Sequence, residues 1–173
     1  MGAVVEQLKV LEHRGYHFEV ADGSLELLMR QATGWKQPYF TLESHRVITD
    51  LRDDNTFVTE ATVKVLVGDK RVIATAEGNG PVNALDAAMR QAIGPAYPDL
   101  SRVHLTDYKV RVLDTSRGTG AVTRVLIDST DGERTWTTIG VSENVIEASW
   151  AALADSIVFG LLQVEASGQN RPL

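Results

Sequence analysis

The sequence predicts an α+β fold made of two βββα repeats with pseudo-twofold symmetry, preceded by a short helical segment. Two regions of the chain alternate apolar with polar residues, each contains a glycine-aspartate turn, and each ends in an apolar stripe with helical spacing. The second region repeats the first at an offset of 63 to 65 positions, because Val82 aligns with Val145 and His45 with Val110. A period of this length that occurs twice favours a pseudo-twofold domain over a solenoid.

Residues 1–36 are expected to form a helical subdomain of two short helices. Near the N-terminus, apolar residues recur at spacings of four and three, at Val4, Leu8 and Leu11. This spacing predicts one apolar face on a helix that Gly15 ends. Ser24 is the expected N-cap of a second helix, and Gly34 is expected to stop that helix.

The main domain of the fold is expected over residues 37–165, and its first βββα repeat over about residues 37–95. After Pro38 the period changes to two, and Gly68-Asp69 supplies a hairpin turn between the second and third strands. The loop Gly78-Asn79-Gly80-Pro81 then leads into a helix, whose first turn accepts Pro81 because the missing N–H costs nothing there. The glycines give this loop a structural role, the sharp turn that positions the helix over the sheet. The third glycine of a dinucleotide fingerprint is absent.

The second repeat is expected over about residues 101–165, with Asp131-Gly132 as its hairpin turn. An apolar stripe at helical spacing follows its third strand, at Val145, Ile146, Trp150, Leu153, Ile157 and Leu161. Residues 166–173 are expected to form a C-terminal tail. Two three-stranded sheets with one helix each cannot bury both helix faces alone, so we expect them to pack on one another or on a second subunit.

The composition excludes several classes of function. The net charge is −6 and no stretch concentrates Lys and Arg, so nucleic-acid binding is not expected. The absence of cysteine excludes disulfides, thiolate metal sites and cysteine redox chemistry. Glu6, Lys9 and Glu12 interrupt the first apolar stretch, so neither a signal peptide nor a membrane span is expected there and the chain is expected to be soluble and cytoplasmic. His13 and His17 have a zinc-ligand spacing but no third ligand nearby, so we expect no metal and no cofactor in this chain.

Three motifs resemble the C-terminal regulatory domain of the 2-isopropylmalate synthase and citramalate synthase family. They are EGNGPVNALDAA at 77–88, LTDYKVR at 105–111 and WTTIGVSENVIEASW at 136–150, and the last is closer to the citramalate synthase branch. Residues 15–28 are similar to the linker subdomain that joins the regulatory domain to the catalytic domain. Taken together the motifs are specific, and the resemblance covers nearly the whole chain.

The resemblance implies a regulatory role within a longer parent chain. Enzymes of this family condense acetyl-CoA with a 2-oxoacid, pyruvate in citramalate synthases, on an N-terminal TIM barrel that holds a divalent metal. Such a barrel takes about 250 residues, so the chain is not expected to be an enzyme by itself. The family's regulatory domain dimerises and binds the end-product amino acid, isoleucine in citramalate synthases and leucine in isopropylmalate synthases. Three alternatives stay open: the leucine-sensing domain of a 2-isopropylmalate synthase, a dimerisation scaffold with no working effector site, and a small stand-alone enzyme.

The resemblance also assigns an effector site to the second repeat. It implies an apolar wall from Leu105, Tyr108, Val112 and Val122. The turn at 141–144 would close the pocket, and Ser142 or Asn144 would cap a helix whose N-terminus receives the effector carboxylate. Asp107 would balance the ammonium. Family members often carry proline where this chain has Glu143. Without the resemblance, the apolar wall residues are explained as core residues of a half-buried sheet.

Overall fold

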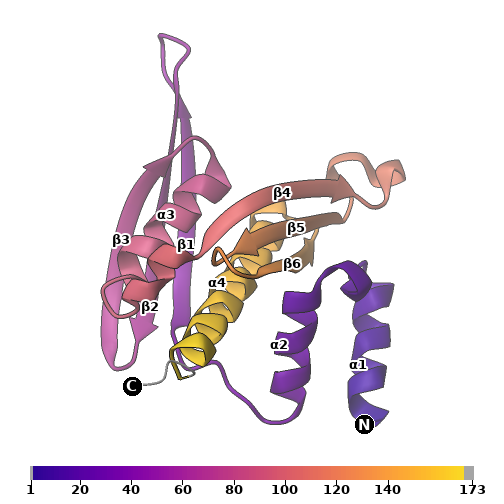
Figure 1. Ribbon diagram of the computed structural model, residues 1–173. Helices are drawn as coiled ribbons and strands as arrows, with labels where there is room; N and C mark the ends of the chain where they lie inside the picture. The colour runs from indigo at the N-terminus through magenta and orange to yellow at the C-terminus, as the bar shows by residue number, and fades with distance from the viewer. Residues whose placement is uncertain (1, 170–173) are drawn as a thin grey trace. The chain divides into compact units, whose positions relative to one another are not determined.

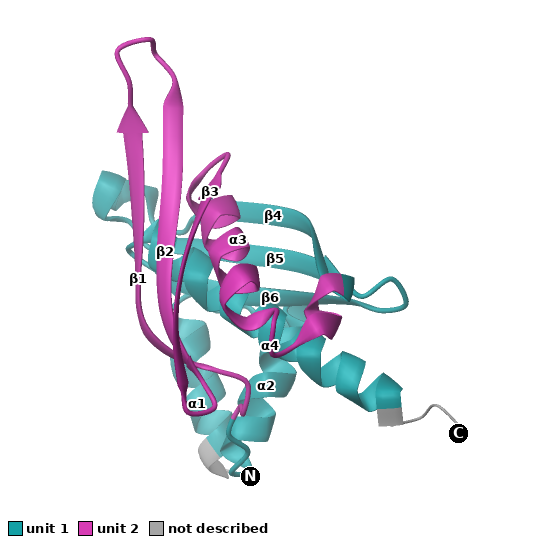
Figure 2. Ribbon diagram, turned by 90° about the vertical axis from the view of Figure 1, so that its left-hand side faces the viewer, with its two compact units in different colours: residues 1–36, 102–173 teal, residues 37–101 magenta. Residues whose placement is uncertain are grey.

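The structure is a computed structural model that describes residues 2–169 (Figure 1). The chain divides into two compact units, one of residues 37–101 and one that combines residues 1–36 with 102–173 (Figure 2). Each unit contains a three-stranded antiparallel sheet followed by one helix. The α+β class and the repeated βββα order are therefore confirmed.

The unit of residues 37–101 contains the first repeat. Its strands are β1 (Thr41–Leu51), β2 (Phe57–Val67) and β3 (Lys70–Gly78), in that spatial order, and α3 (Pro81–Ile93) packs on the sheet. A short 3-10 helix, η2 (Pro98–Arg102), follows. The alternation in β2 buries Ala61, Val63 and Val65 completely, as its period of two requires. Gly68 turns the hairpin with a φ of 59°, in the left-handed region that favours glycine.

The loop from β3 to α3 depends on a close backbone approach. A Cβ on Gly78 would lie 2.5 Å from the Ala84 nitrogen, so only glycine lets α3 sit this near to β3. Asn79 N–H donates to the Asn83 side chain at 3.0 Å, and Gly80 is extended. Pro81 occupies the first turn of α3, as expected.

The other unit contains the second repeat, with the spatial strand order β4-β5-β6. Its strands are β4 (His104–Val112), β5 (Thr123–Thr130) and β6 (Thr135–Ser142), and the 3-10 segment η3 (Thr115–Gly120) joins β4 to β5. The long helix α4 (Val145–Gln169) lies across β5 and β6 (Figure 1). It approaches β6 so closely that a Cβ on Gly140 would lie 1.9 Å from the Ala148 carbonyl oxygen.

Helix α4 is the core helix of this unit. An 18-residue window within residues 145–168 has a mean hydropathy of 1.6, so the helix is long and apolar enough to cross a membrane by length and composition alone. More than half of that window is buried inside the protein, and Ala152, Leu153 and Ile157 are completely buried. The sheet therefore accounts for the apolar character of α4. The helix extends into the expected tail at 166–173, of which residues 170–173 lie outside the described part of the chain.

The N-terminal helical segment, residues 2–36, belongs to the same unit as β4–β6 and α4. It consists of α1 (Gly2–His13), η1 (Phe18–Val20) and α2 (Asp22–Ala32), with Gly15 and Gly34 at positive φ after the two helices, as expected. Phe18, Ala21 and Ile139 form the buried centre where this segment packs on β6. Helix α2 also contacts α4.

The prediction that Ser24 caps α2 was wrong. The helix begins at Asp22, its N-cap position is Ala21, and Ser24 lies buried within the first turn. Its hydroxyl donates to the Asp155 carboxylate at 2.7 Å and accepts the Ile139 N–H at 3.0 Å. Tertiary hydrogen bonds to α4 and β6 therefore use the side chain that the local pattern assigned to a cap.

Candidate functional site

One face of β4 is open and apolar. Tyr108, Val110 and Val112 pair in register with Ile127, Val125 and Thr123, which are buried on the side that α4 covers. Because β4 is an edge strand and α4 packs over β5 and β6, the three side chains remain 40%, 46% and 45% exposed. We call Tyr108, Val110 and Val112 the β4 apolar strip. Leu105 precedes the strip on the same face, opposite Ser129.

A hydrogen bond of Tyr108 connects the strip to α4. Its phenol lies 2.8 Å from the Ser149 hydroxyl, which in turn donates to the Val145 carbonyl at 2.6 Å. Since the serine hydrogen is used by that carbonyl, the tyrosine donates to the serine oxygen. Ser149 is completely buried, so the contact fixes the phenol against the second turn of the helix.

The turn before α4 lies at the same end of the sheet as Val112. Val112 pairs with Thr123, and Thr123 pairs with Ser142, so the three residues form one row across the sheet. Asn144 caps α4, since its side-chain oxygen accepts the N–H groups of Ile146 at 2.9 Å and Glu147 at 3.3 Å. A carboxylate that used these two amides would have to displace the Asn144 side chain.

Ser142 and Glu143 stabilise this turn from either side. The Ser142 hydroxyl accepts the Asn144 N–H at 3.0 Å and donates to the Glu147 carboxylate at 2.7 Å. Glu143 pairs with Arg117 of η3 at 3.0 Å, with both side chains more than half exposed. Such an exposed ion pair contributes about 0–1 kcal/mol to stability, so the contact with Arg117 does not hold Glu143 rigidly at the edge of the strip.

Asp107 lies away from the strip. A bulge between Leu105 and Asp107 changes the alternation of β4, so Leu105 and Tyr108 share a face although they are three residues apart, and Asp107 pairs in register with Asp128. The Asp107 carboxylate lies 2.7 Å from the Lys109 ammonium. The hydrogen bond from Lys109, with help from the Tyr108 N–H, lowers the pKa of Asp107. The carboxylate is therefore already paired on the opposite face.

Val122 also falls outside the strip. It immediately precedes Thr123, which faces α4, so by strand alternation Val122 is directed to the other side. Its carbonyl accepts the N–H of Leu113, whose side chain lies against Gly15 of the helical segment. The structure thus places Leu105, Tyr108 and Val112 on one face of β4, with only Val112 in the row of Ser142, and it separates Asp107 and Val122 from that face.

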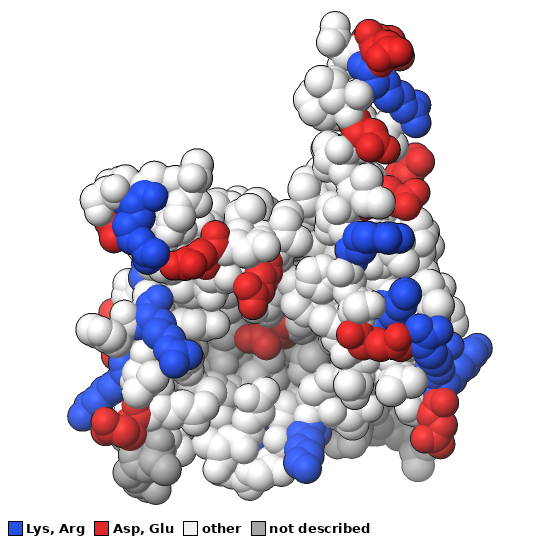
Figure 3. Space-filling view, turned by 180° about the vertical axis from the view of Figure 1, so that it is seen from behind, with Lys and Arg blue, Asp and Glu red and all other residues white. Residues whose placement is uncertain are grey.

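The face opposite α4 holds a basic hollow that the sequence did not indicate. A cavity of about 480 Å³ is lined there by Lys109, Arg111 and Arg124, with Asp128 among them. Arg124 donates to the Gly15 carbonyl at 2.6 Å, and burial together with the nearby Arg111 lowers its pKa. On the face of the molecule seen in Figure 3, however, basic and acidic side chains are interspersed.

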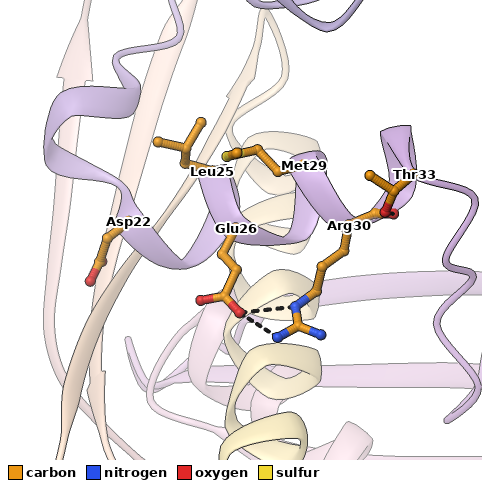
Figure 4. A pocket seen from close by; sticks show the side chains of 6 residues that line it. All are labelled: Asp22, Leu25, Glu26, Met29, Arg30 and Thr33. Carbon is orange, nitrogen blue, oxygen red and sulfur yellow. Dashed lines mark hydrogen bonds and ion pairs between the residues drawn. The ribbon is translucent and has the colours of Figure 1, made fainter. Parts of the chain in front are cut away.

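A second hollow runs along one face of α2. Its lining residues recur at helical spacing, and Figure 4 shows them: Asp22, Leu25, Glu26, Met29, Arg30 and Thr33. Arg30 is held by Glu26 at 2.6 Å, one turn earlier. This hollow is an open helix face rather than an enclosed site, because α2 and the residue that follows it supply all of its lining.

Comparison with known proteins agrees with this architecture. Residues 19–160 match the family model described as the LeuA allosteric (dimerisation) domain. The chain is 51% identical over 164 residues to the (R)-citramalate synthase of Streptomyces coelicolor, which covers 94% of this chain and 31% of that protein. It is 49% identical over 166 residues to the Aquifex aeolicus (R)-citramalate synthase, covering 95% and 31%, and 38% identical over 157 residues to that of Sulfolobus acidocaldarius, covering 91% and 28%. The chain thus spans about a third of the length of the curated relatives it matches.

Proposed function

The chain belongs to the LeuA allosteric (dimerisation) domain family, and from this premise we propose that it gives feedback regulation to an (R)-citramalate synthase. The described residues form linker helices and two βββα units, the part of such an enzyme that regulates rather than catalyses. In this proposal the parent chain is a cytoplasmic acyltransferase of isoleucine biosynthesis that condenses acetyl-CoA with pyruvate on its catalytic barrel. The relatives named (R)-citramalate synthase support the proposal.

The proposed effector is an aliphatic amino acid, isoleucine in the first place. The observation that carries this proposal is the β4 apolar strip, an open apolar surface that ends beside the capped N-terminus of α4. Covering an aliphatic side chain of this size contributes about 1.5–3 kcal/mol, enough for a weak site that a second surface would strengthen. Leucine and isoleucine have equal apolar surface, so the shape of the strip decides between them.

The carboxylate and the ammonium of an amino acid are bonded to one carbon, so their partners must lie near one another, beside the first two turns of α4. The carboxylate would take the first amides of α4 and displace the Asn144 side-chain oxygen. Asp107, the expected partner of the ammonium, is engaged with Lys109 on the opposite face. We therefore assign the ammonium to the phenol oxygen of Tyr108, which lies on the strip side of the sheet and can still accept a hydrogen bond.

We also propose that two copies of the chain form a homodimer. The strip leaves three neighbouring apolar side chains open on an edge strand, where a second subunit would cover them together with the effector. An effector held between subunits favours one packing of the βββα units. The helical segment would carry that preference to the catalytic domain, because it is joined to α4 and β6 through Ser24.

Calorimetric titration of the chain with isoleucine and with leucine tests this function. We expect isoleucine to bind in the micromolar to millimolar range and leucine to bind more weakly, and Tyr108→Asp to abolish binding of both. If neither amino acid binds at millimolar concentration, the effector assignment fails. If leucine binds more tightly, the alternative of a leucine-sensing isopropylmalate synthase domain replaces it.

A dimerisation scaffold without a working effector site is the second candidate. It is favoured by the occupied helix amides at Asn144 and by the Glu143–Arg117 pair, where family members often carry proline. Light scattering with and without isoleucine separates the two candidates. A scaffold forms dimers whose mass and stability do not respond to the amino acid, whereas an effector domain becomes more resistant to dissociation when isoleucine is present.

A further inference from the structure

A cavity separate from the β4 apolar strip lies where the helical segment meets α4. It has a volume of about 350 Å³, which lies within the range of small-molecule sites. Its walls are mostly apolar and come from α1, η1, α2, β6 and α4, including Leu11, Phe18, Leu28, Ile139 and Trp150. Asp155 of α4 places a carboxyl group in this apolar lining.

We propose that this cavity is a second ligand site, which takes a small apolar molecule carrying a protonated primary amine that pairs with the Asp155 carboxylate. The site lies between the helical segment and α4, so a bound ligand would stabilise the contact that attaches the segment to α4. It is independent of the effector site on β4 and goes beyond the feedback function proposed above.

The hydrogen bonds around Asp155 leave room for such a cation. The carboxylate accepts the Ser24 hydroxyl at 2.7 Å, and the Ser24 oxygen accepts the Ile139 N–H. An ionised carboxylate offers about four acceptor sites, so one hydroxyl donor satisfies only part of its capacity. An ammonium group, with three donors, supplies both the missing hydrogen bonds and the opposite charge.

The electrostatics of the cavity favour a cation and disfavour an anion. Burial, opposed by the hydrogen bond from Ser24, raises the pKa of Asp155 to about 6. Burial and the neighbouring Asp155 charge also raise the pKa of Tyr16, which lines the cavity from the segment between α1 and η1. Gln31 of α2 adds a neutral amide to the lining. A ligand ammonium would supply the charge that compensates the carboxylate, whereas a ligand carboxylate would meet Asp155 without compensation.

This reasoning predicts a selectivity that differs from that of the effector site. The cavity should prefer an aliphatic amine to a neutral alcohol of the same shape, since only the amine pairs with the carboxylate. It should also reject the zwitterion isoleucine, whose carboxylate finds no compensating group. The effector site on β4 should show the reverse preference, so failure of either proposal leaves the other testable.

The test is calorimetric titration of the chain at pH 7.5 with three probes: 3-methylbutylamine, 3-methylbutan-1-ol and isoleucine. The variant Asp155→Asn keeps the shape of the side chain and removes its charge, and Asp69→Asn, at an exposed hairpin position, is the matched control. We expect the amine to bind at least roughly 10-fold more tightly than the alcohol, and Asp155→Asn to lose at least that factor while Asp69→Asn loses none. Amide chemical shifts should change for residues that line the cavity.

Lowering the pH provides an independent readout. Amine affinity should fall between pH 7.5 and pH 5, as Asp155 is protonated around its pKa of about 6, while the amine itself stays charged. The proposal is overturned if the amine does not bind at roughly 10 mM, if Asp155→Asn binds it as well as the unmodified chain, or if the affected amides lie outside the cavity. Binding of isoleucine at β4 with no amine response would overturn this inference alone.

Discussion

Replacing Asp155 with asparagine should stabilise the folded chain at neutral pH. The carboxyl group lies at the wall of an apolar cavity, where burial raises its pKa from 3.8 to about 6. Asparagine has nearly the same shape, and its side-chain oxygen can accept the Ser24 hydroxyl as the carboxylate does. The substitution therefore removes the cost of a partly buried charge and keeps the hydrogen bond.

The magnitude follows from the pKa. One unit corresponds to about 1.4 kcal/mol, so the rise from 3.8 to about 6 corresponds to about 3 kcal/mol. Asp155 is partly exposed, and solvent screening reduces the expected gain to about 1–3 kcal/mol. A raised pKa means that the folded chain binds the proton more tightly, so the contribution is fully present below pH 3.8 and is lost as the pH rises through about 6.

Urea denaturation between pH 5 and pH 8 measures this difference. The free energy of unfolding of Asp155→Asn should exceed that of the unmodified chain by its full amount at pH 8 and by about half of that amount at pH 5. Asp69→Asn, the exposed control, should show no comparable change. An Asp155→Asn variant that is less stable at pH 8, or that differs by the same amount at both pH values, would refute the assignment of a raised pKa to this group.

Three further substitutions test the packing around the β4 apolar strip. Gly140→Ala places a Cβ against the α4 backbone and should lower the free energy of unfolding by about 2–4 kcal/mol. The control Gly120→Ala adds a Cβ in open space and should change the free energy of unfolding little. Equal effects of the two variants in urea denaturation would contradict the close approach of α4 to β6. Tyr108→Phe removes one hydrogen bond to a buried hydroxyl and should cost about 1 kcal/mol by the same assay, so an unchanged midpoint would argue against that bond. Arg117→Ala breaks the exposed ion pair with Glu143 and should change the free energy of unfolding by less than about 1 kcal/mol. A larger loss that does not depend on salt would show that the ion pair holds the turn before α4 rigidly.

Local patterns were sufficient to predict the architecture. The two hairpin glycines, Gly68 and Gly132, adopt positive φ at the expected turns, and Pro81 begins α3 as its fixed geometry requires. These features depend on neighbours in sequence and on periods of two and 3.6, which a single sequence displays directly. The regulatory identity came from the motifs, and the family match confirmed it.

The details of the site depend on contacts that local patterns do not reveal. Asp107 and Tyr108 point to opposite faces by strand alternation, and the bulge between Leu105 and Asp107 puts Leu105 on the face of Tyr108, because a shift of one residue exchanges the faces of a strand. Ser24 looked like a cap because its partner Asp155 lies 131 positions away. Asp155 itself is a charged residue of the largely apolar helix α4, and no local pattern indicates that it lines a cavity.

The most direct test of the regulatory role compares two valines of nearly equal exposure. Val110 lies in the β4 apolar strip and is 46% exposed, and Val10 lies in α1 outside the strip and is 47% exposed. In calorimetric titrations with isoleucine, Val110→Glu should abolish binding while Val10→Glu retains the affinity of the unmodified chain. Isoleucine binding that survives Val110→Glu, or that is lost equally in both variants, would contradict an effector site on the strip.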